Sequence, residues 1–353
     1  MVTLASSLHN LWYAKTGVAT LQRTVRFSLF AMTLFASALP PTQAQSQILE
    51  PHAVQEYGPL RTYAQSPIQA NSLTPQLRDA RGFNVGEMEL FGSATIASVW
   101  AHTDHYTLDY YQNSLSLGWA WQASPQWQWE LSYRWVFSAD NHIDGVSLAF
   151  HQWAGIEQNG RDEVARHRSV FALSRDGFDH QNIEGRTLSS AFSLYGQWQL
   201  FQTKEHAISL GGTLYYNNVT NGPFQGHDFE QALQLNYAWH QGSHHIYSSI
   251  GATHHGNKGW RNANIAKREF TWSGAVGYQY QSSAHHNWII EYHAYQGELD
   301  NDTDLSKTSQ EVVAGYRYVM SQSAIELVII ENVFNMDNST DVAFLLNYRY
   351  RFH

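Results

Sequence analysis

The stretch LSLGWAWQASPQWQWELSYRWVF, residues 115–137, alternates large apolar side chains with small or polar ones. A period of two places successive side chains on opposite faces of a β-strand. A turn around Ser124 and Pro125 divides the stretch into two strands, which predicts a hairpin. Pairing Trp121 with Trp127 would collect every large apolar group on one face of this hairpin.

The type of apolar residue shows what this face meets. A soluble sandwich would fill it mainly with aliphatic side chains, whereas here Trp and Tyr gather beside the tight turn. The same arrangement recurs near residues 237–239, 278–280 and 316–318. Such placement is typical of a lipid-facing band that ends in an aromatic girdle.

Composition agrees with a membrane protein that crosses by strands. Of 353 residues only 14% are charged, with 13 Trp and 20 Tyr, whereas soluble domains carry about 25% charged residues. Mean hydropathy is −0.41, and no apolar run reaches the ~20 residues of a transmembrane helix. A net charge of −9 excludes a basic nucleic-acid-binding surface. With no cysteine, disulfides, thiolate zinc sites, cysteine nucleophiles and a lipoprotein anchor are excluded.

The N-terminus reads as an export signal. Basic residues precede the apolar run 27–39, and Thr42-Gln43-Ala44 ends in the small residue that a signal peptidase requires. We predict a signal peptide over residues 1–44 with cleavage after Ala44. Its removal takes away three basic and no acidic residues, so the mature chain would carry a formal charge of −12.

Alternation continues from residue 86 to the C-terminus. It predicts an all-β, antiparallel transmembrane outer-membrane barrel, residues 86–353, of about twelve strands. The predicted strands are 86–102, 105–121, 127–137, 188–200, 207–218, 227–239, 244–254, 268–281, 287–297, 308–320, 323–334 and 341–352.

The even count requires one long extracellular excursion at residues 138–187. Ile143, Val146, Phe150 and Trp153 are spaced as in a short amphipathic helix there, or they merely anchor the loop. The segment 170–174 either belongs to this excursion or is a thirteenth strand with an unrecognised partner, which would make fourteen.

The last strand is the most specific signal. It alternates through an aromatic-rich face and ends one residue before the C-terminus. This ending predicts insertion into the outer membrane by the barrel-insertion machinery, with the lipid bilayer and lipopolysaccharide as surroundings. The residues concerned are Phe344, Leu346, Tyr348, Tyr350 and Phe352.

Three segments carry a family resemblance. They are Gly58–Pro67 (GPLRTYAQSP), the run from Phe150–Gly155 (FHQWAG) to Asn159–Glu163 (NGRDE), and the ending from Glu331-Asn332 to YRYRF at 348–352. Together they resemble domain of unknown function 3187, an uncharacterised family from Gram-negative bacteria, over most of residues 58–352. The resemblance implies an exported envelope protein and supplies no activity or catalytic residue.

Charged side chains of both signs occupy the inward positions of the predicted strands. The turn at Met320–Ser323 places Arg317 opposite Glu326, and barrel closure would bring the last strand's arginines to the first strand's glutamates. The lumen-facing candidates are Glu87, Glu89, Glu130, Arg134, Glu291, Glu311, Arg317, Glu326, Arg349 and Arg351.

These charges allow two interpretations. They form ladders that close a narrow lumen, or they line a constriction that selects solutes. Residues 45–85 lack alternation and form either a plug inside the barrel or a periplasmic lead-in. The leading hypothesis is a narrow passive channel for small polar solutes. The alternative is a closed structural or interaction barrel acting through its outer loop, where Arg161, Asp162 and Glu163 are the candidates.

Catalytic and metal sites are not predicted. The histidine pairs 244–245, 254–255 and 285–286 lie near strand ends, where solvated imidazoles are expected, and neighbours on a strand point to opposite faces. Asp140-Asn141-His142 is similar to part of a protease site, and His254-His255-Gly256-Asn257 lacks the serine of a lipase. An outer-membrane lipid or peptide hydrolase is therefore the least favoured hypothesis, and no cofactor is expected.

Overall fold

The alternating segments form one antiparallel sheet. The computed structural model describes residues 56–143, 168–257 and 265–353, with the single positions 145, 149, 152 and 259. The strands are β1 (Met88–His102), β2 (Thr107–Gln122), β3 (Trp127–Ser138), β4 (Val170–Leu173), β5 (Phe178–Gln181), β6 (Thr187–Gln202), β7 (His206–Val219), β8 (Gly226–Gln241), β9 (His244–His255), β10 (Phe270–Gln281), β11 (His286–Tyr295), β12 (Ser309–Val319), β13 (Ser323–Asn332) and β14 (Val342–Phe352). Short 3₁₀ turns are η1 (Gln69–Asn71), η3 (Ser174–Asp176), η4 (Asp304–Ser306) and η5 (Met336–Asn338).

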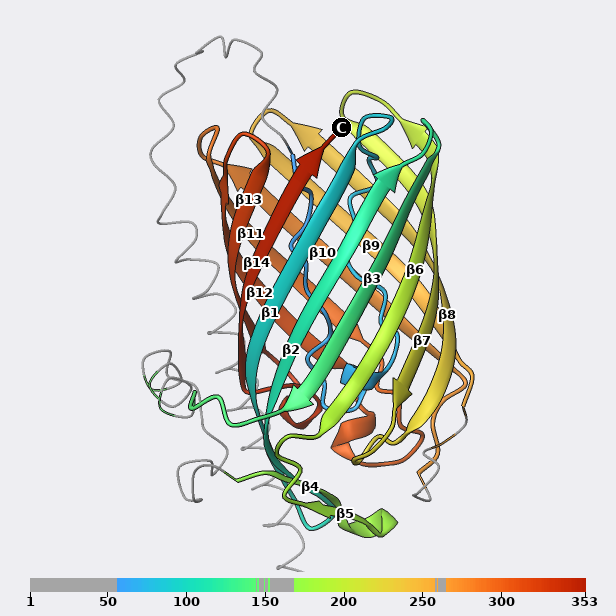
Figure 1. Cartoon of the computed structure of the whole chain (residues 1–353), viewed down its shortest axis with the longest axis vertical. Coiled ribbons are helices and arrows are strands. Elements are labelled where there is room, and N and C mark those ends of the chain that lie inside the picture. Colours follow the sequence, from blue (N-terminus) through green and yellow to red (C-terminus); the bar gives the residue numbers. More distant parts are fainter. Residues whose placement is uncertain are drawn as a thin grey trace, which may run out of the picture. The chain divides into compact units, whose positions relative to one another are not determined.

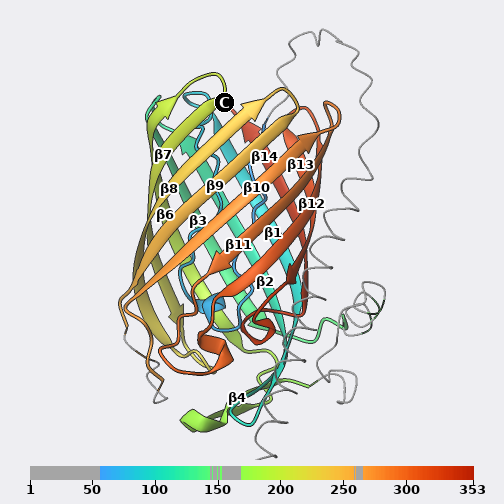
Figure 2. The same ribbon diagram turned by 180° about the vertical axis from the view of Figure 1, so that it is seen from behind.

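The sheet closes on itself because β1 pairs with both β2 and β14. Within the described residues it has fourteen strands, and all except β4 and β5 form the closed barrel (Figures 1 and 2). The predicted all-β outer-membrane barrel of about twelve strands is confirmed. Among the described residues, no helix is long and apolar enough to cross a membrane.

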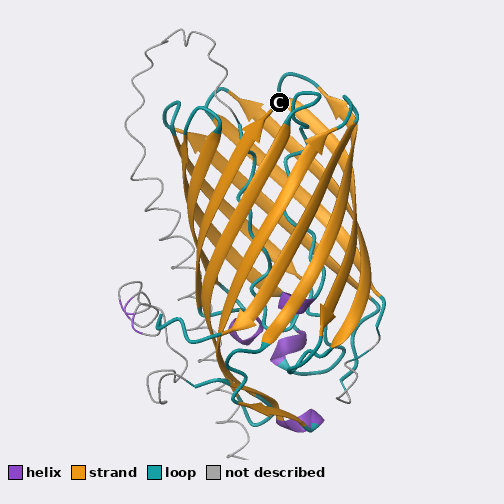
Figure 3. Cartoon of the chain, viewed as in Figure 1, coloured by secondary structure: helices purple, strands orange, loops and turns teal. Residues whose placement is uncertain are grey.

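The two ends of the barrel differ. The end that carries the C-terminus has short turns, and the opposite end has longer connections and the β4–β5 hairpin (Figure 3). Outer-membrane barrels have short periplasmic turns and longer extracellular loops. We therefore call these ends periplasmic and extracellular.

The outer face of the barrel is apolar, as the alternation requires. Leu117, Leu233 and Ile250 are each more than 60% exposed, and the residues next to them in the chain are less exposed. Indole rings stack beside the periplasmic turns, with centroids of Trp127 and Trp129 5.5 Å apart. These side chains form the band that meets lipid.

The predicted register of the first hairpin is wrong by two residues. Trp121 pairs with Trp129, not with Trp127. The reason is the turn: Ala123 N donates to Trp127 O over 2.9 Å, and Ser124 Oγ accepts from Trp127 N over 3.1 Å, so the turn is centred one residue later. A shift of two leaves every side chain on its predicted face.

The long connection between β3 and β6 contains the hairpin of β4 and β5. The start of β2 pairs with β4, and β5 pairs only with β4. The segment at 170–174 is thus a strand with a partner, outside the closed barrel. The helix predicted around Val146, Phe150 and Trp153 falls on residues outside the described part of the chain, as does the predicted signal peptide.

Residues 56–83, here called the inner segment, run inside the barrel (Figure 1). Gly58 O accepts a bond from Arg317 near the periplasmic end, and Ser66 Oγ donates to Asn338 at the extracellular end. After η1 the chain returns, and Arg81 binds the carbonyls of the periplasmic turn between β6 and β7. The segment is therefore a loop that enters and leaves at the periplasmic mouth.

The extracellular end is closed by apolar packing. Ile68 at the tip of the inner segment shares a buried cluster with Phe171 of β4, Phe178 of β5, Phe224 and Leu305. Phe171 and Phe224 meet edge to face with ring centroids 5.0 Å apart. This cluster packs the tip of the inner segment against the extracellular connections.

We expect a charge on the lipid face to destabilise the barrel. Leu233→Arg, in the middle of β8, should lower the free energy of unfolding in liposomes by about 2–4 kcal/mol, since the guanidinium would face hydrocarbon. Denaturant titration in lipid measures this.

The matched control is Val85→Arg, at a half-exposed position before β1, where the change should be within about 0.5 kcal/mol. Equal effects at the two positions would contradict the assignment of the lipid face.

Candidate functional site

The lumen holds the charged side chains that the alternation placed inward. Each of the ten is at most 7% exposed. They are Glu87, just before β1; Glu89 of β1; Glu130 and Arg134 of β3; Glu291 of β11; Glu311 and Arg317 of β12; Glu326 of β13; and Arg349 and Arg351 of β14. The outer-loop candidates Arg161, Asp162 and Glu163 lie outside the described residues.

The line where β1 meets β14 is joined by ion pairs. Glu89 accepts from Arg349 Nε over 3.0 Å and from Arg351 Nε over 2.8 Å. Arg61 of the inner segment adds a third guanidinium, 3.2 Å from the same carboxylate. Arg351 also lies 3.9 Å from Glu87. A buried carboxylate is tolerated only with such partners.

Arg317 connects the next strand pair to the inner segment. Its Nε donates to Glu326 over 2.7 Å, and its Nη2 donates to Gly58 O over 2.7 Å. Glu326 also accepts from Asn347 and Arg349. The ring of Tyr57 lies against the guanidinium groups of Arg349 and Arg351. The inner segment therefore adds a carbonyl acceptor and an aromatic ring to the charged groups of the barrel wall.

On β3, two strands from β1, one carboxylate holds both limbs of the inner segment. Glu130 accepts from Arg61 over 2.5 Å and makes two bonds with Arg78, of 2.7 and 2.9 Å. Arg134 donates to carbonyls of Ala70 and Ser72. These contacts tie the outgoing and returning limbs to the same strand.

Two wall carboxylates bind backbone amides of the inner segment. Leu60 N donates to Glu291 and Gln65 N donates to Glu311, each over 2.8 Å. His293 Nε2 lies 2.9 Å from Glu291. The alternation predicts that these glutamates face inward. It does not identify their backbone partners, because the inner segment has no periodicity.

A second charged cluster was missed by the sequence reasoning. Glu230 of β8 accepts from Leu73 N over 2.5 Å and lies 2.8 Å from His255 Nδ1. Lys267 forms an ion pair with Glu298, which also accepts from Ser72 Oγ over 2.7 Å. Alternation on β8 places Glu230 inward, so its face was available from sequence. Of its partners, His255 lies on β9 and also has a predictable face, whereas Leu73 and Lys267 come from segments without alternation and were not predictable.

The expectation that all the histidine pairs are solvated is wrong. His245 is fully buried and His255 is 3% exposed, because the second histidine of each pair on β9 faces the lumen. Their neighbours are less buried, with His244 exposed and His254 half-buried, and both members of the pair 285–286 are exposed. The period of two along β9 would have predicted that these two histidines face the lumen.

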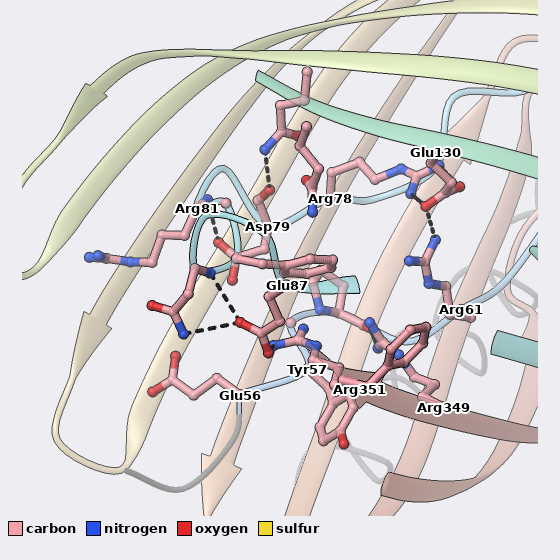
Figure 4. A pocket seen from close by; sticks show the side chains of 18 of the residues that line it. Glu56, Tyr57, Arg61, Arg78, Asp79, Arg81, Glu87, Glu130, Arg349 and Arg351 are labelled. Carbon is pink, nitrogen blue, oxygen red and sulfur yellow. Dashed lines mark hydrogen bonds and ion pairs between the residues drawn. The ribbon is translucent and has the colours of Figure 1, made fainter. Parts of the chain in front are cut away.

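The periplasmic mouth contains a cavity of about 820 Å³. Its lining comes from both limbs of the inner segment, from β3 and from the end of β14 (Figure 4). Arginine and glutamate side chains project into it, but they are already bonded to one another, as with Arg61 and Glu130. The cavity is lined by polar and charged side chains of both signs, and both limbs of the inner segment form part of its wall.

The two enzyme-like motifs do not form a recognisable site. His142 Nδ1 lies 3.3 Å from Asp140, and the His142 side chain is 76% exposed. His255 is held between Glu230 and Thr271, deep in the barrel. The two motifs therefore lie on different elements, one exposed and one buried.

Sequence comparison places the chain in a family. The family model described as "Protein of unknown function (DUF3187)" matches residues 43–352. The chain belongs to this family. A search of the curated proteins found no match to this DUF3187 protein.

Solved structures share the fold. The COG4313 outer membrane channel from Pseudomonas putida F1 has 10% sequence identity and a TM-score of 0.50, over 80% of this chain and 100% of that chain. The NanC porin has 9% identity and a TM-score of 0.43, over 74% of this chain and 98% of that one. At this identity the first likeness shows the barrel fold alone, and the second carries no argument.

We expect Glu89 to be the least replaceable charge in this DUF3187 barrel. Glu89→Gln would leave three buried guanidinium groups without their common partner and should cost about 3–5 kcal/mol in unfolding free energy. Urea titration in detergent measures the loss.

The control is Asp304→Asn, which breaks a surface ion pair with Lys307 and should cost less than about 1 kcal/mol. A Glu89→Gln protein as stable as this control would show that the β1–β14 network does not stabilise the barrel.

Proposed function

We propose that the protein is an outer-membrane channel for small polar solutes that the inner segment holds closed. The coarse part of this proposal, a barrel of the outer-membrane channel type, follows from the fold. The finer part rests on how the lumen is filled.

The observation that carries the proposal is the path of the inner segment. Both of its limbs reach the periplasmic mouth: Glu56 lies beside the β8–β9 turn and Arg81 beside the β6–β7 turn. A loop that enters and leaves by the same mouth can withdraw without threading an end through the barrel. Removing it would expose a wall of glutamate, arginine, asparagine and glutamine side chains, which suits polar solutes.

The contacts also explain why the closed state is stable. The inner segment satisfies Glu291, Glu311 and Glu230 through backbone amides. Its withdrawal would remove these amide donors, although each carboxylate keeps a partner on the wall, such as His293 at Glu291. A channel built this way opens only when solvent or another group replaces those bonds.

The alternative is a permanently closed barrel that acts through its outer loop. The apolar cluster at the extracellular end, around Ile68 and Phe171, favours this reading because a channel must part it. A hydrolase is the less favoured alternative, since it rests on Asp140 and His142 alone.

We propose the outer membrane as the location and lipid with lipopolysaccharide as the surroundings. The exposed apolar band supports this. We also propose that the barrel-insertion machinery recognises β14, whose side chains Leu346, Tyr348 and Tyr350 are exposed on the outer face.

Planar-bilayer recordings test the channel. We expect the intact protein to give few and small conductance steps, and a variant lacking residues 57–81 to give frequent and larger ones. Circular dichroism and the heat-dependent gel shift of folded barrels show whether each protein is folded.

A variant lacking residues 144–167, between β3 and β4 in the sequence, is the control for shortening the chain and should conduct like the intact protein. A folded 57–81 deletion without larger steps would refute the channel. If that deletion does not fold, the pair Arg78→Ala and Arg61→Ala, which loosens both limbs at Glu130, should raise the step frequency in its place. Unchanged steps in that folded pair would equally refute the channel.

A second experiment addresses insertion. Tyr350→Ala combined with Phe352→Ala should lower the fraction of folded barrel in cells several-fold, while refolding of the purified chain in detergent stays the same. Tyr318→Ala on β12, another exposed aromatic near a periplasmic turn, is the control. Equal losses for both proteins would show that β14 has no special part in insertion.

A further inference from the structure

We propose that Glu56, His240 and His245 bind a divalent transition-metal ion of the zinc class at the periplasmic mouth. Glu56 Oε2 lies 2.9 Å from His240 Nδ1 and 3.7 Å from His245 Nδ1. One donor atom of each residue lies within 4.8 Å of the others. Donors that bind Zn²⁺ tetrahedrally at about 2.0–2.1 Å are about 3.3 Å apart, so these spacings need little adjustment.

The imidazoles have free nitrogen atoms in the right place. His245 is fully buried, and among the described residues neither of its ring nitrogens has a hydrogen-bond partner. His240 Nε2 is likewise buried without one. The two rings lie side by side, with centroids 4.3 Å apart. Buried polar atoms are nearly always bonded, and a metal ion would supply the missing bond for His245.

A carboxylate lies beside one of the proposed ligands, His240. Asp79 Oδ2 lies 3.7 Å from His240 Nε2, on the ring edge opposite the nitrogen that faces Glu56. A metal-binding histidine commonly presents its second nitrogen to a carboxylate, which fixes the ring and raises its basicity. Glu56 and Asp79 both line the periplasmic cavity (Figure 4), which gives the ion and its water a route of entry.

The charges around the cluster favour a cation. Two carboxylates lie beside the imidazoles: Glu56 is 2.9 Å and Asp79 is 3.7 Å from ring nitrogens of His240. The nearby cation is Arg81, whose guanidinium is already bonded to the carbonyls of Thr203 and Lys204 over 3.0 and 2.9 Å.

In the second acid–histidine cluster, a lysine side chain already occupies the space between the carboxylates. Glu230, His255 and Glu298 meet the same distance criterion. There the Lys267 ammonium lies between the carboxylates, bonded to Glu298 and 4.0 Å from Glu230. Lys267 thus takes the place of a metal ion. The cluster at the periplasmic mouth has no lysine in the described residues to do so.

Metal binding would fasten the inner segment to the wall. Glu56 lies at its start, whereas His240 is the last residue but one of β8 and His245 is the second residue of β9, across a tight turn. An ion held by all three would therefore join the inner segment to the barrel rim. The effect of this ion on conduction rests on the proposed function, whereas the inference of the binding site does not.

Isothermal titration of the folded protein with Zn²⁺ tests the site, using a chain without a histidine tag. We expect one strong site, weakened at least ~100-fold by the double variant His240→Ala and His245→Ala, and about 10–100-fold by Asp79→Asn. His244→Ala is the matched control, because His244 neighbours His245 on the outward face and bonds Tyr278. It should leave the strong site unchanged.

Two further readouts separate specific from adventitious binding. Co²⁺ in the intact protein should give the visible absorption of a four-coordinate site, and the double variant should not. Zn²⁺ should slow amide hydrogen exchange in the inner segment several-fold in the intact protein only. Equal Zn²⁺ affinity in the intact protein and the folded double variant would overturn the proposal, as would loss of the strong site in His244→Ala. None of these measurements depends on conductance, so they stand apart from the test of the channel.

Discussion

Every other feature of this molecule depends on the closure of β1 against β14. Hydrocarbon offers no hydrogen bonds, so a sheet in a membrane cannot leave an edge unpaired. The β1–β14 register runs from Met88 opposite Phe352 to Ser98 opposite Val342, which removes both edges. Closure turns one face of each strand outward to lipid and the other into a confined space. The alternation in the sequence reflects these two faces. It explains why the chain has a low fraction of charged residues together with many Trp and Tyr side chains.

Closure also creates a problem inside. The inward face is rich in carboxylates, which cannot be buried without partners. The wall supplies some of them, as Arg317 does for Glu326. The inner segment supplies the rest in two ways: its arginines pair with Glu89 and Glu130, and its backbone amides bind Glu291 and Glu311. A chain without periodicity suits this task because its amides are not committed to a sheet. The wall and the inner segment are therefore complementary, and neither is satisfied alone.

The extent to which the sequence predicts this structure follows from the same distinction. Strand limits and faces were predictable because period two is imposed by lipid at every strand, and an error of two residues at Trp121 and Trp129 left the faces intact. The partners of the inward charges were not predictable where they come from aperiodic chain, as with Leu60 at Glu291 or Lys267 at Glu298. Nothing in the order of residues 56–83 marks which amide meets which carboxylate. The His245 face was predictable from alternation, but its proximity to Glu56 depends on the path of the inner segment.

The two ends of the lumen differ in the forces that close them, and this gives any opening a direction. At the extracellular end, Ile68 packs with aromatic side chains from β4, β5 and neighbouring connections, a contact that weakens little with pH or ions. At the periplasmic end, the inner segment is held by Arg81 at backbone carbonyls and by Glu56 at two histidines. The second contact uses side chains that can exchange protons and that would bind the proposed metal ion. Because both limbs emerge at this second end, the contacts that respond to the surroundings are the ones that control withdrawal. The cavity of about 820 Å³, lined by both limbs of the inner segment, gives the first displaced residues room on that side. For the proposed channel, this arrangement implies opening from the periplasm, with the extracellular apolar cluster parting last.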